Sequence, residues 1–256
     1  MASNHKNIKN YAAETAKSTL DFGENRLKLV MCCIICAVVT VLAWLLSDVV
    51  VIAFGVFSLT VPFFVSSAVM TVILLFLAAP LYIGTFKMAV RMLDGENAEI
   101  VDIFEVFASR AEYVRALALS FLLFLRMLPL VVVIFAPMAV IDISESATQI
   151  INLLLAPAAV LALIFAAHSF GFVGFACIDE GLSVSQAAKM ASKARKGNYK
   201  SVYALAFSTL LKLLLSLMTL GILTVIHTVP TALLTYGAMA QELKNKSEIK
   251  PERTDI

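Results

Sequence analysis

Residues 27–46 read LKLVMCCIICAVVTVLAWLL, and this stretch decides the fold class. Its single charge, Lys28, stands near the beginning. A bilayer has a hydrocarbon core about 30 Å thick, which an α-helix of roughly 20 apolar residues can cross. Backbone groups in lipid must be hydrogen bonded within the segment, so this continuous apolar run predicts a membrane-spanning helix. Polar residues precede it and no small-residue cleavage pattern follows, so we expect a retained anchor.

The composition extends this prediction to the whole chain. Of its 256 residues, 61% are hydrophobic and 15% are charged, whereas a soluble domain is about half apolar and a quarter charged. The apolar runs are long rather than alternating, which favours helices over a β-barrel. We therefore expect an all-α polytopic bundle of six spans, near 27–46, 65–87, 116–140, 150–176, 201–220 and 222–243. The apolar stretch 49–64 is interpreted as an interfacial or re-entrant external segment.

Basic residues predict the orientation of these spans, because cytoplasmic segments retain Lys and Arg. All but two of the 20 basic residues fall in, or at the edge of, segments on one side of the membrane. The opposite segments contain only acidic charges, namely Asp48, Asp142 and Glu145. We predict one membrane domain, 1–256, in the plasma membrane with both termini cytoplasmic. It comprises a cytoplasmic amphipathic segment, the six-span bundle and a cytoplasmic tail, at 1–26, 27–243 and 244–256.

Each cytoplasmic segment before a span has apolar residues at helical spacing, which predicts three amphipathic surface helices. The first face consists of Ile8, Tyr11, Ala12, Thr15, Thr19 and Leu20. The second consists of Ile100, Ile103, Phe104, Phe107, Ala111 and Val114, and the third of Val184, Ala187, Ala188, Ala191 and Ala194. Short matches, such as ALALS at 116–120 and ALAFS at 204–208, suggest a threefold repeat of surface helix plus helical hairpin. The alternative is chance similarity among a few apolar residue types.

The second and third cytoplasmic segments differ in charge. The second is acidic, with Asp94, Glu96, Glu99, Asp102, Glu105 and Glu112, whereas the third contains the bases Lys189, Lys193 and Lys196. One hypothesis is that the two segments pair at the cytoplasmic face, with the basic one also contacting anionic lipid headgroups. The alternative is that both faces are simply solvated.

Arg126 and Lys212 are the two basic residues deep inside predicted spans, and a charge at bilayer depth is a candidate functional site. Within these bounds the acidic residue Glu242 stands only at the cytoplasmic end of the last span, so the partners of Arg126 and Lys212 at bilayer depth would be backbone carbonyls, water or an external anion. Pro129 lacks an N–H and leaves the carbonyl of Leu125 free. We hypothesise an anion-accepting cavity between the third and fifth spans. The alternative is structural satisfaction by carbonyls or by Ser120, Ser208 or Thr209.

Other polar groups in the spans give weaker predictions. His168 in the fourth span could titrate or bind a metal, or could hydrogen bond to a neighbouring residue. Cys32 and Cys36 are one helical turn apart, but no histidine or carboxylate accompanies them, so packing is expected rather than metal binding. No cofactor or metal site is predicted.

Several motifs resemble a bacterial integral membrane family called domain of unknown function 975. They are PLYIG at 80–84, KGNY at 196–199, ALAFS at 204–208, TLGI at 219–222 and Pro230, and the resemblance extends from about residue 8 to residue 243. Two positions depart from the family pattern: Thr209 stands where a tryptophan is common, and Thr231 where an aromatic residue follows the proline. The resemblance implies a multi-span bacterial membrane protein without an established activity.

Enzyme signatures are missing from the sequence, including a His-Glu-x-x-His pair, a Gly-x-Ser-x-Gly elbow and a phosphate-binding glycine loop. We therefore predict a non-enzymatic accessory or envelope factor that binds membrane lipids, including anionic headgroups, or a protein partner at the cytoplasmic face, and no nucleic acid. A small transporter with an anion-accepting intramembrane cavity is the alternative. A lipid-modifying enzyme is the third class.

Overall fold

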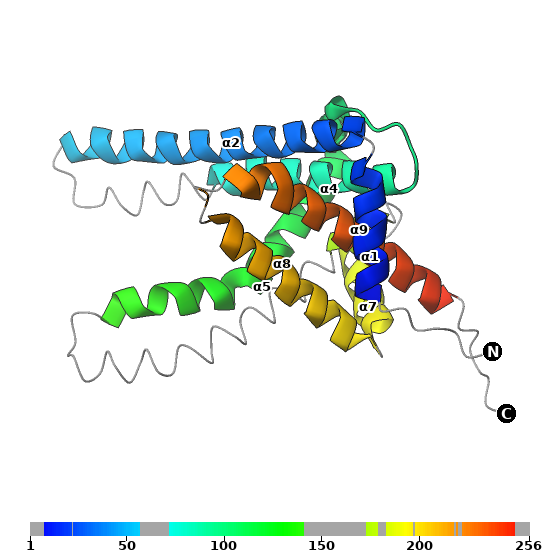
Figure 1. The fold of residues 1–256 in the computed structure, drawn as a ribbon. Coiled ribbons are helices and arrows are strands. Elements are labelled where there is room, and N and C mark those ends of the chain that lie inside the picture. The colour runs from blue at the N-terminus through cyan, green and yellow to red at the C-terminus, as the bar shows by residue number, and fades with distance from the viewer. Residues whose placement is uncertain are drawn as a thin grey trace, which may run out of the picture.

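The computed structural model describes residues 8–21, 23–56, 72–140, 173–178, 183–196, 198–217, 219 and 222–248. These parts of the chain are helical and contain no strand, which confirms the predicted all-α class. The elements are α1 (Ile8–Asp21), α2 (Gly23–Val56), η1 (Leu74–Ala78), α4 (Ala79–Leu93), η2 (Ile100–Phe107), α5 (Arg110–Val140), α7 (Val184–Arg195), α8 (Tyr199–Leu217), η3 (Thr224–Thr228) and α9 (Val229–Glu248). In Figure 1, α1 lies across the end of the molecule at which α2 begins.

Helix α2 is longer than the predicted span. It has 34 residues and continues beyond residue 46 to Val56, so it is roughly 50 Å long. Residues 49–56 therefore extend the helix and do not form the separate external segment that we expected there. The apolar run has no proline in this part, and each added residue gains an i→i+4 hydrogen bond once a helix is established. Residues 57–64 lie outside the described part of the chain.

Two described helical stretches are long and apolar enough to cross a membrane, Gly23–Leu46 and Phe76–Leu93. Only 33% of the most apolar window in Gly23–Leu46 is buried, against 61% in Phe76–Leu93. The outer part of α2 exposes large apolar side chains, including Val41 at 53%, Trp44 at 56% and Ile52 at 67%. An exposed apolar surface of this kind is typical of a membrane or partner contact. The other four predicted spans either do not meet the same test or include residues outside the described ranges.

Two π-helical turns occur at corresponding points of the chain. The turn η1 leads into α4 and the turn η3 leads into α9. In each, the N–H of the following residue, Ala79 or Val229, donates to the carbonyl five residues earlier. Pro80 and Pro230 come next, and a proline cannot donate the ordinary helical hydrogen bond. We call α2, η1 and α4 the N-terminal pair, and α8, η3 and α9 the C-terminal pair.

The two pairs share a second local feature in the same register. Thr85 and Thr235 each stand five residues after the proline. The Thr85 hydroxyl donates to the Leu81 carbonyl at 2.9 Å, and the Thr235 hydroxyl donates to the Thr231 carbonyl at 2.6 Å. Alignment of the prolines therefore gives a residue-by-residue comparison of α4 with α9.

One arm of each pair packs against a short helix that lies outside the pair. Helix α4 contacts η2, and α9 contacts α1. The helical residues 173–178 share a buried cluster with Ala187 and Ala191 of α7. Gly84 permits the first of these contacts, because an added Cβ there would lie 2.2 Å from the backbone oxygen of Ile103 in η2.

The surface helices agree with the sequence in two cases out of three. Helix α1 buries Ile8, Ala12 and Ala16 but exposes Tyr11 of the predicted face, and α7 buries Ala187, Ala191 and Ala194, so both segments are helices with one buried face. The second segment instead forms a 3₁₀-helix, η2, that buries Ile103 and Val106 and leaves Phe104 and Phe107 exposed. A 3₁₀-helix has three residues per turn, so residues 103 and 106 share a side, whereas the predicted face assumed 3.6.

Candidate functional site

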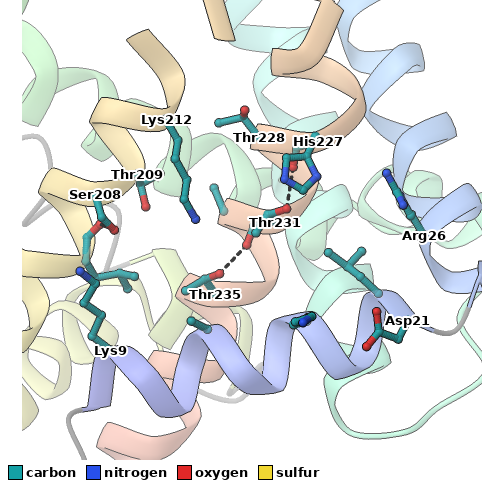
Figure 2. Close-up of a pocket in the computed structure, with 15 residues that line it drawn as sticks. Lys9, Asp21, Arg26, Ser208, Thr209, Lys212, His227, Thr228, Thr231 and Thr235 are labelled. Atoms are coloured by element: carbon teal, nitrogen blue, oxygen red, sulfur yellow. Dashed lines mark hydrogen bonds between the residues drawn. The ribbon is translucent and has the colours of Figure 1, made fainter. Parts of the chain in front are cut away.

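A cavity of about 400 Å³ lies between α1, α8, η3 and α9 (Figure 2). The cavity exists because the two arms of the C-terminal pair pack together mainly through η3. In the N-terminal pair α2 packs directly against α4, whereas α8 contacts the other arm of its pair through η3. Figure 1 shows α8 and α9 diverging from that point. Helix α1 lies across α9 and also contacts α8, so it covers the space between them.

Basic side chains from three helices line this cavity. They are Lys9 and Lys17 of α1, Arg26 of α2 and Lys212 of α8, and His227 of η3 also lines it. Asp21 is the single carboxylate among the lining residues. Lys17, Arg26 and Lys212 are exposed, and within the described ranges none of the four bases makes an ion pair. Figure 2 shows Lys212 extending from α8 toward α9. The cavity therefore carries a positive charge and is open to solvent.

Hydroxyl groups form the inner wall of the cavity, namely Ser208, Thr209, Thr228, Thr231 and Thr235. Three of them donate their proton to their own helix. Ser208 donates to the Leu205 carbonyl at 3.0 Å, and Thr231 to the His227 carbonyl at 2.6 Å. Thr235 donates to the Thr231 carbonyl. A hydroxyl has one proton and two acceptor lone pairs, so these three oxygens are left to act as hydrogen-bond acceptors.

The structure does not bring the two predicted bases into one cavity. Lys212 lines the cavity described above, but Arg126 is not among the lining residues. Arg126 lies near Arg195 instead, where burial, and to a smaller extent the charge of Arg126, lowers the pKa of Arg195 to about 10. Helix α5 remains an α-helix through Pro129, so the proline does not interrupt the helix beside Leu125. His168 lies outside the described residues.

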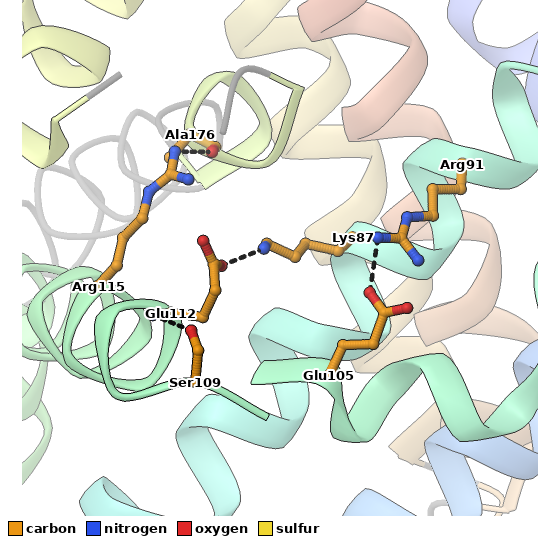
Figure 3. Close-up of polar contacts among 7 residues, drawn as sticks. All are labelled: Lys87, Arg91, Glu105, Ser109, Glu112, Arg115 and Ala176. Carbon is orange, nitrogen blue, oxygen red and sulfur yellow. Dashed lines mark hydrogen bonds and ion pairs between the residues drawn. The ribbon is translucent and has the colours of Figure 1, made fainter. Parts of the chain in front are cut away.

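A separate set of polar contacts joins α4, η2 and α5 (Figure 3). Lys87 forms an ion pair with Glu112 at 2.6 Å, and Arg91 forms one with Glu105, also at 2.6 Å. The hydrogen bond from Arg91 lowers the pKa of Glu105. In the described ion pairs the acidic segment thus contacts bases of α4, not the lysines of α7 that we had considered.

The corresponding space in the N-terminal pair is filled by side chains. Cys32 of α2 lies 3.3 Å, sulfur to sulfur, from Met88 of α4, and Cys36 lies 3.3 Å from the Thr85 hydroxyl. All four cysteines of the chain are buried, and none forms a disulfide. Among the described residues, no group of three or more histidine, cysteine or acidic side chains is placed to hold a metal ion.

Sequence reasoning missed most of the cavity. Lys9 and Lys17 were counted only as cytoplasmic charges, although residues eight apart stand two turns apart and within about 80° of each other around a helix. In the same way, Thr228, Thr231 and Thr235 form a hydroxyl stripe at i, i+3 and i+7 along η3 and α9. Helical spacing of polar residues within an apolar stretch was the signal that could have identified this wall.

Comparison of the chain with protein-family models, with curated proteins and with solved structures gives no match. The role of the cavity is therefore inferred from its geometry alone.

Proposed function

We propose that this chain is a non-enzymatic integral membrane protein, a lipid- or partner-binding accessory factor that crosses the plasma membrane six times with both termini in the cytoplasm. The main observation behind this proposal is the set of exposed apolar side chains along the outer part of α2. At about 25 cal/mol per Å², exposure of so much apolar surface to water is unfavourable, and a lipid environment removes the cost. The positive charge confined to one set of segments supports the orientation.

Helix α1 supports a role at the membrane surface. It lies across α9 rather than alongside it, as an interfacial helix does, and its bases Lys9 and Lys17 face the cavity. The likeness to the family domain of unknown function 975 is part of this proposal, and so is a repeat of three units. The shared proline register of α4 and α9 supports the repeat, as does the packing of each arm on the surface helix of another unit.

The topology is tested by labelling single added cysteines in intact cells with a membrane-impermeant maleimide. The four native cysteines are buried, so they give little background. Six spans predict that Asp142→Cys is labelled from outside, whereas Ser18→Cys and Asn245→Cys react only after the membrane is permeabilised. Recovery of the protein in the soluble fraction, or labelling of Ser18→Cys in intact cells, would overturn the proposal.

The alternative function, a small transporter with an anion-accepting cavity, is favoured by one observation. Lys212 lies in a predicted span, and its side chain lines the cavity. Uptake of radiolabelled phosphate or glycerol phosphate into vesicles containing the purified protein, compared with empty vesicles, separates transport from binding. Uptake above that of the empty vesicles would replace the accessory role with transport.

A further inference from the structure

We propose that the cavity between α1, α8 and α9 binds a phosphate ester whose headgroup also carries hydroxyl groups. This inference deepens the proposed function, which supplies the membrane setting, by naming the ligand class. A glycerophosphate unit has this chemistry, whether it is the headgroup of phosphatidylglycerol or free glycerol phosphate.

The charge of the cavity selects for an anion. Four bases and one carboxylate line it, and Lys212 of α8 joins three bases from the consecutive helices α1 and α2. Like charges gathered around a partly enclosed space repel one another more strongly than in bulk water, and an anion between them removes this repulsion. Lysine binds phosphate as a point charge, and Arg26 adds a guanidinium that can bind two phosphate oxygens.

The hydroxyl wall selects among anions. Ser208, Thr231 and Thr235 have donated their protons to backbone carbonyls, so their oxygens face the ligand as acceptors. An ionised phosphate also presents mainly acceptors, and it gains nothing from such a wall. A ligand with hydroxyl groups of its own can donate to these oxygens while its phosphate contacts the bases. The two kinds of lining group thus match the two ends of a glycerophosphate.

The size of the cavity agrees with a headgroup. Its volume of about 400 Å³ falls within the usual range of small-molecule sites, roughly 300–1,000 Å³, and is at the lower end of it. On the outer surface of α8, Phe207 and Leu211 are exposed at 68% and 49%, which offers a path for acyl chains next to the cavity. Both the lipid and the soluble source are compatible with these dimensions, and the experiment must distinguish them.

The test is calorimetric titration of the full-length protein in a neutral detergent. The probes are short-chain phosphatidylglycerol, short-chain phosphatidylcholine, glycerol phosphate and inorganic phosphate. We expect one phosphatidylglycerol per chain, and binding of phosphatidylcholine that is weaker by about tenfold or more, because its headgroup has no hydroxyl donor and carries a positive charge. Equal affinity for the two lipids, or no binding of either lipid or of glycerol phosphate, would overturn the proposal.

Three variants and a control locate the site. Lys212→Gln and Lys17→Gln should each weaken binding by about tenfold, whereas Lys193→Gln, an exposed base on α7, should leave it unchanged. Thr231→Val should weaken glycerol phosphate binding without affecting inorganic phosphate, because it removes an acceptor for the hydroxyls. Lys17 and Lys212 are exposed, so the two lysine variants should still fold. Circular dichroism checks that they do. Unchanged binding in Lys212→Gln and Lys17→Gln together would refute the site.

The remaining comparisons identify the source. Glycerol phosphate bound as tightly as short-chain phosphatidylglycerol indicates a soluble ligand, and a clear preference for the lipid indicates a headgroup site. Inorganic phosphate bound as tightly as glycerol phosphate would contradict the role of the hydroxyl wall and so the ligand class. These titrations need no membrane, so a failed topology experiment and a failed binding experiment are separate results.

Discussion

The N-terminal and C-terminal pairs follow the same backbone pattern and differ in what lies between their arms. In both, a π-helical turn precedes a proline, and a threonine five residues later donates to its own helix. Between the arms of the N-terminal pair, Cys36 and Thr85 are in contact. In the C-terminal pair, Thr235 instead faces a cavity with basic side chains. The same backbone pattern is therefore compatible with a filled space in one pair and a cavity in the other, and the side chains between the arms make the difference.

The largest expected difference in stability between the two pairs concerns Gly84. This residue aligns with the fully buried Leu234. A Cβ at residue 84 would lie 2.2 Å from the Ile103 backbone oxygen, so α4 or η2 must move. We expect Gly84→Ala to lower the free energy of unfolding by about 3 kcal/mol, measured by denaturant unfolding in detergent.

Gly23→Ala is the matched control, because an added Cβ there meets no atom within 4 Å. It should change the free energy of unfolding by less than about 0.5 kcal/mol. If Gly84→Ala were as stable as Gly23→Ala, the close packing of η2 on α4 would be wrong.

A second prediction separates structural bases from cavity bases. Lys87 is 12% exposed and pairs with Glu112, so Lys87→Gln should cost about 1–2 kcal/mol of unfolding free energy. Lys212 is exposed and makes no described ion pair, so Lys212→Gln should leave stability within about 0.5 kcal/mol of the unmodified protein. Thermal unfolding of both variants measures the difference. Equal destabilisation would show that the cavity bases also hold the fold together.

The smallest effect concerns Glu105 and its dependence on pH. Arg91 lowers the pKa of this carboxyl from 4.5, so its contribution to stability is present above about pH 4.5 and is lost as the pH falls through the folded-state pKa. Glu105 is half-exposed, which limits the contribution to about 0.5 kcal/mol. Melting curves of the unmodified protein and of Glu105→Gln should differ at neutral pH and converge in acid. A constant difference at every pH would contradict this assignment.

The sequence predicted the helical class and two of the three surface helices, because apolar periodicity depends only on neighbouring residues. The extent of α2 was underestimated, since the span was expected to end at residue 46, before Asp48, and the helix continues through Asp48 to Val56. Lys212 was singled out by its depth in an apolar run. The other bases of the cavity come from α1 and α2, about 200 residues earlier in the chain, and the packing of α1 against α9 and α8 brings its lysines near Lys212.

The most direct test is hydrogen exchange of the full-length protein with and without short-chain phosphatidylglycerol. Binding in the cavity predicts slower exchange in peptides covering α1 and the η3–α9 segment, no change in peptides covering α4, and loss of the effect in Lys212→Gln. Protection spread equally over α4 and α9, or protection that persists in Lys212→Gln, would contradict the claim that the site lies between α1 and the C-terminal pair.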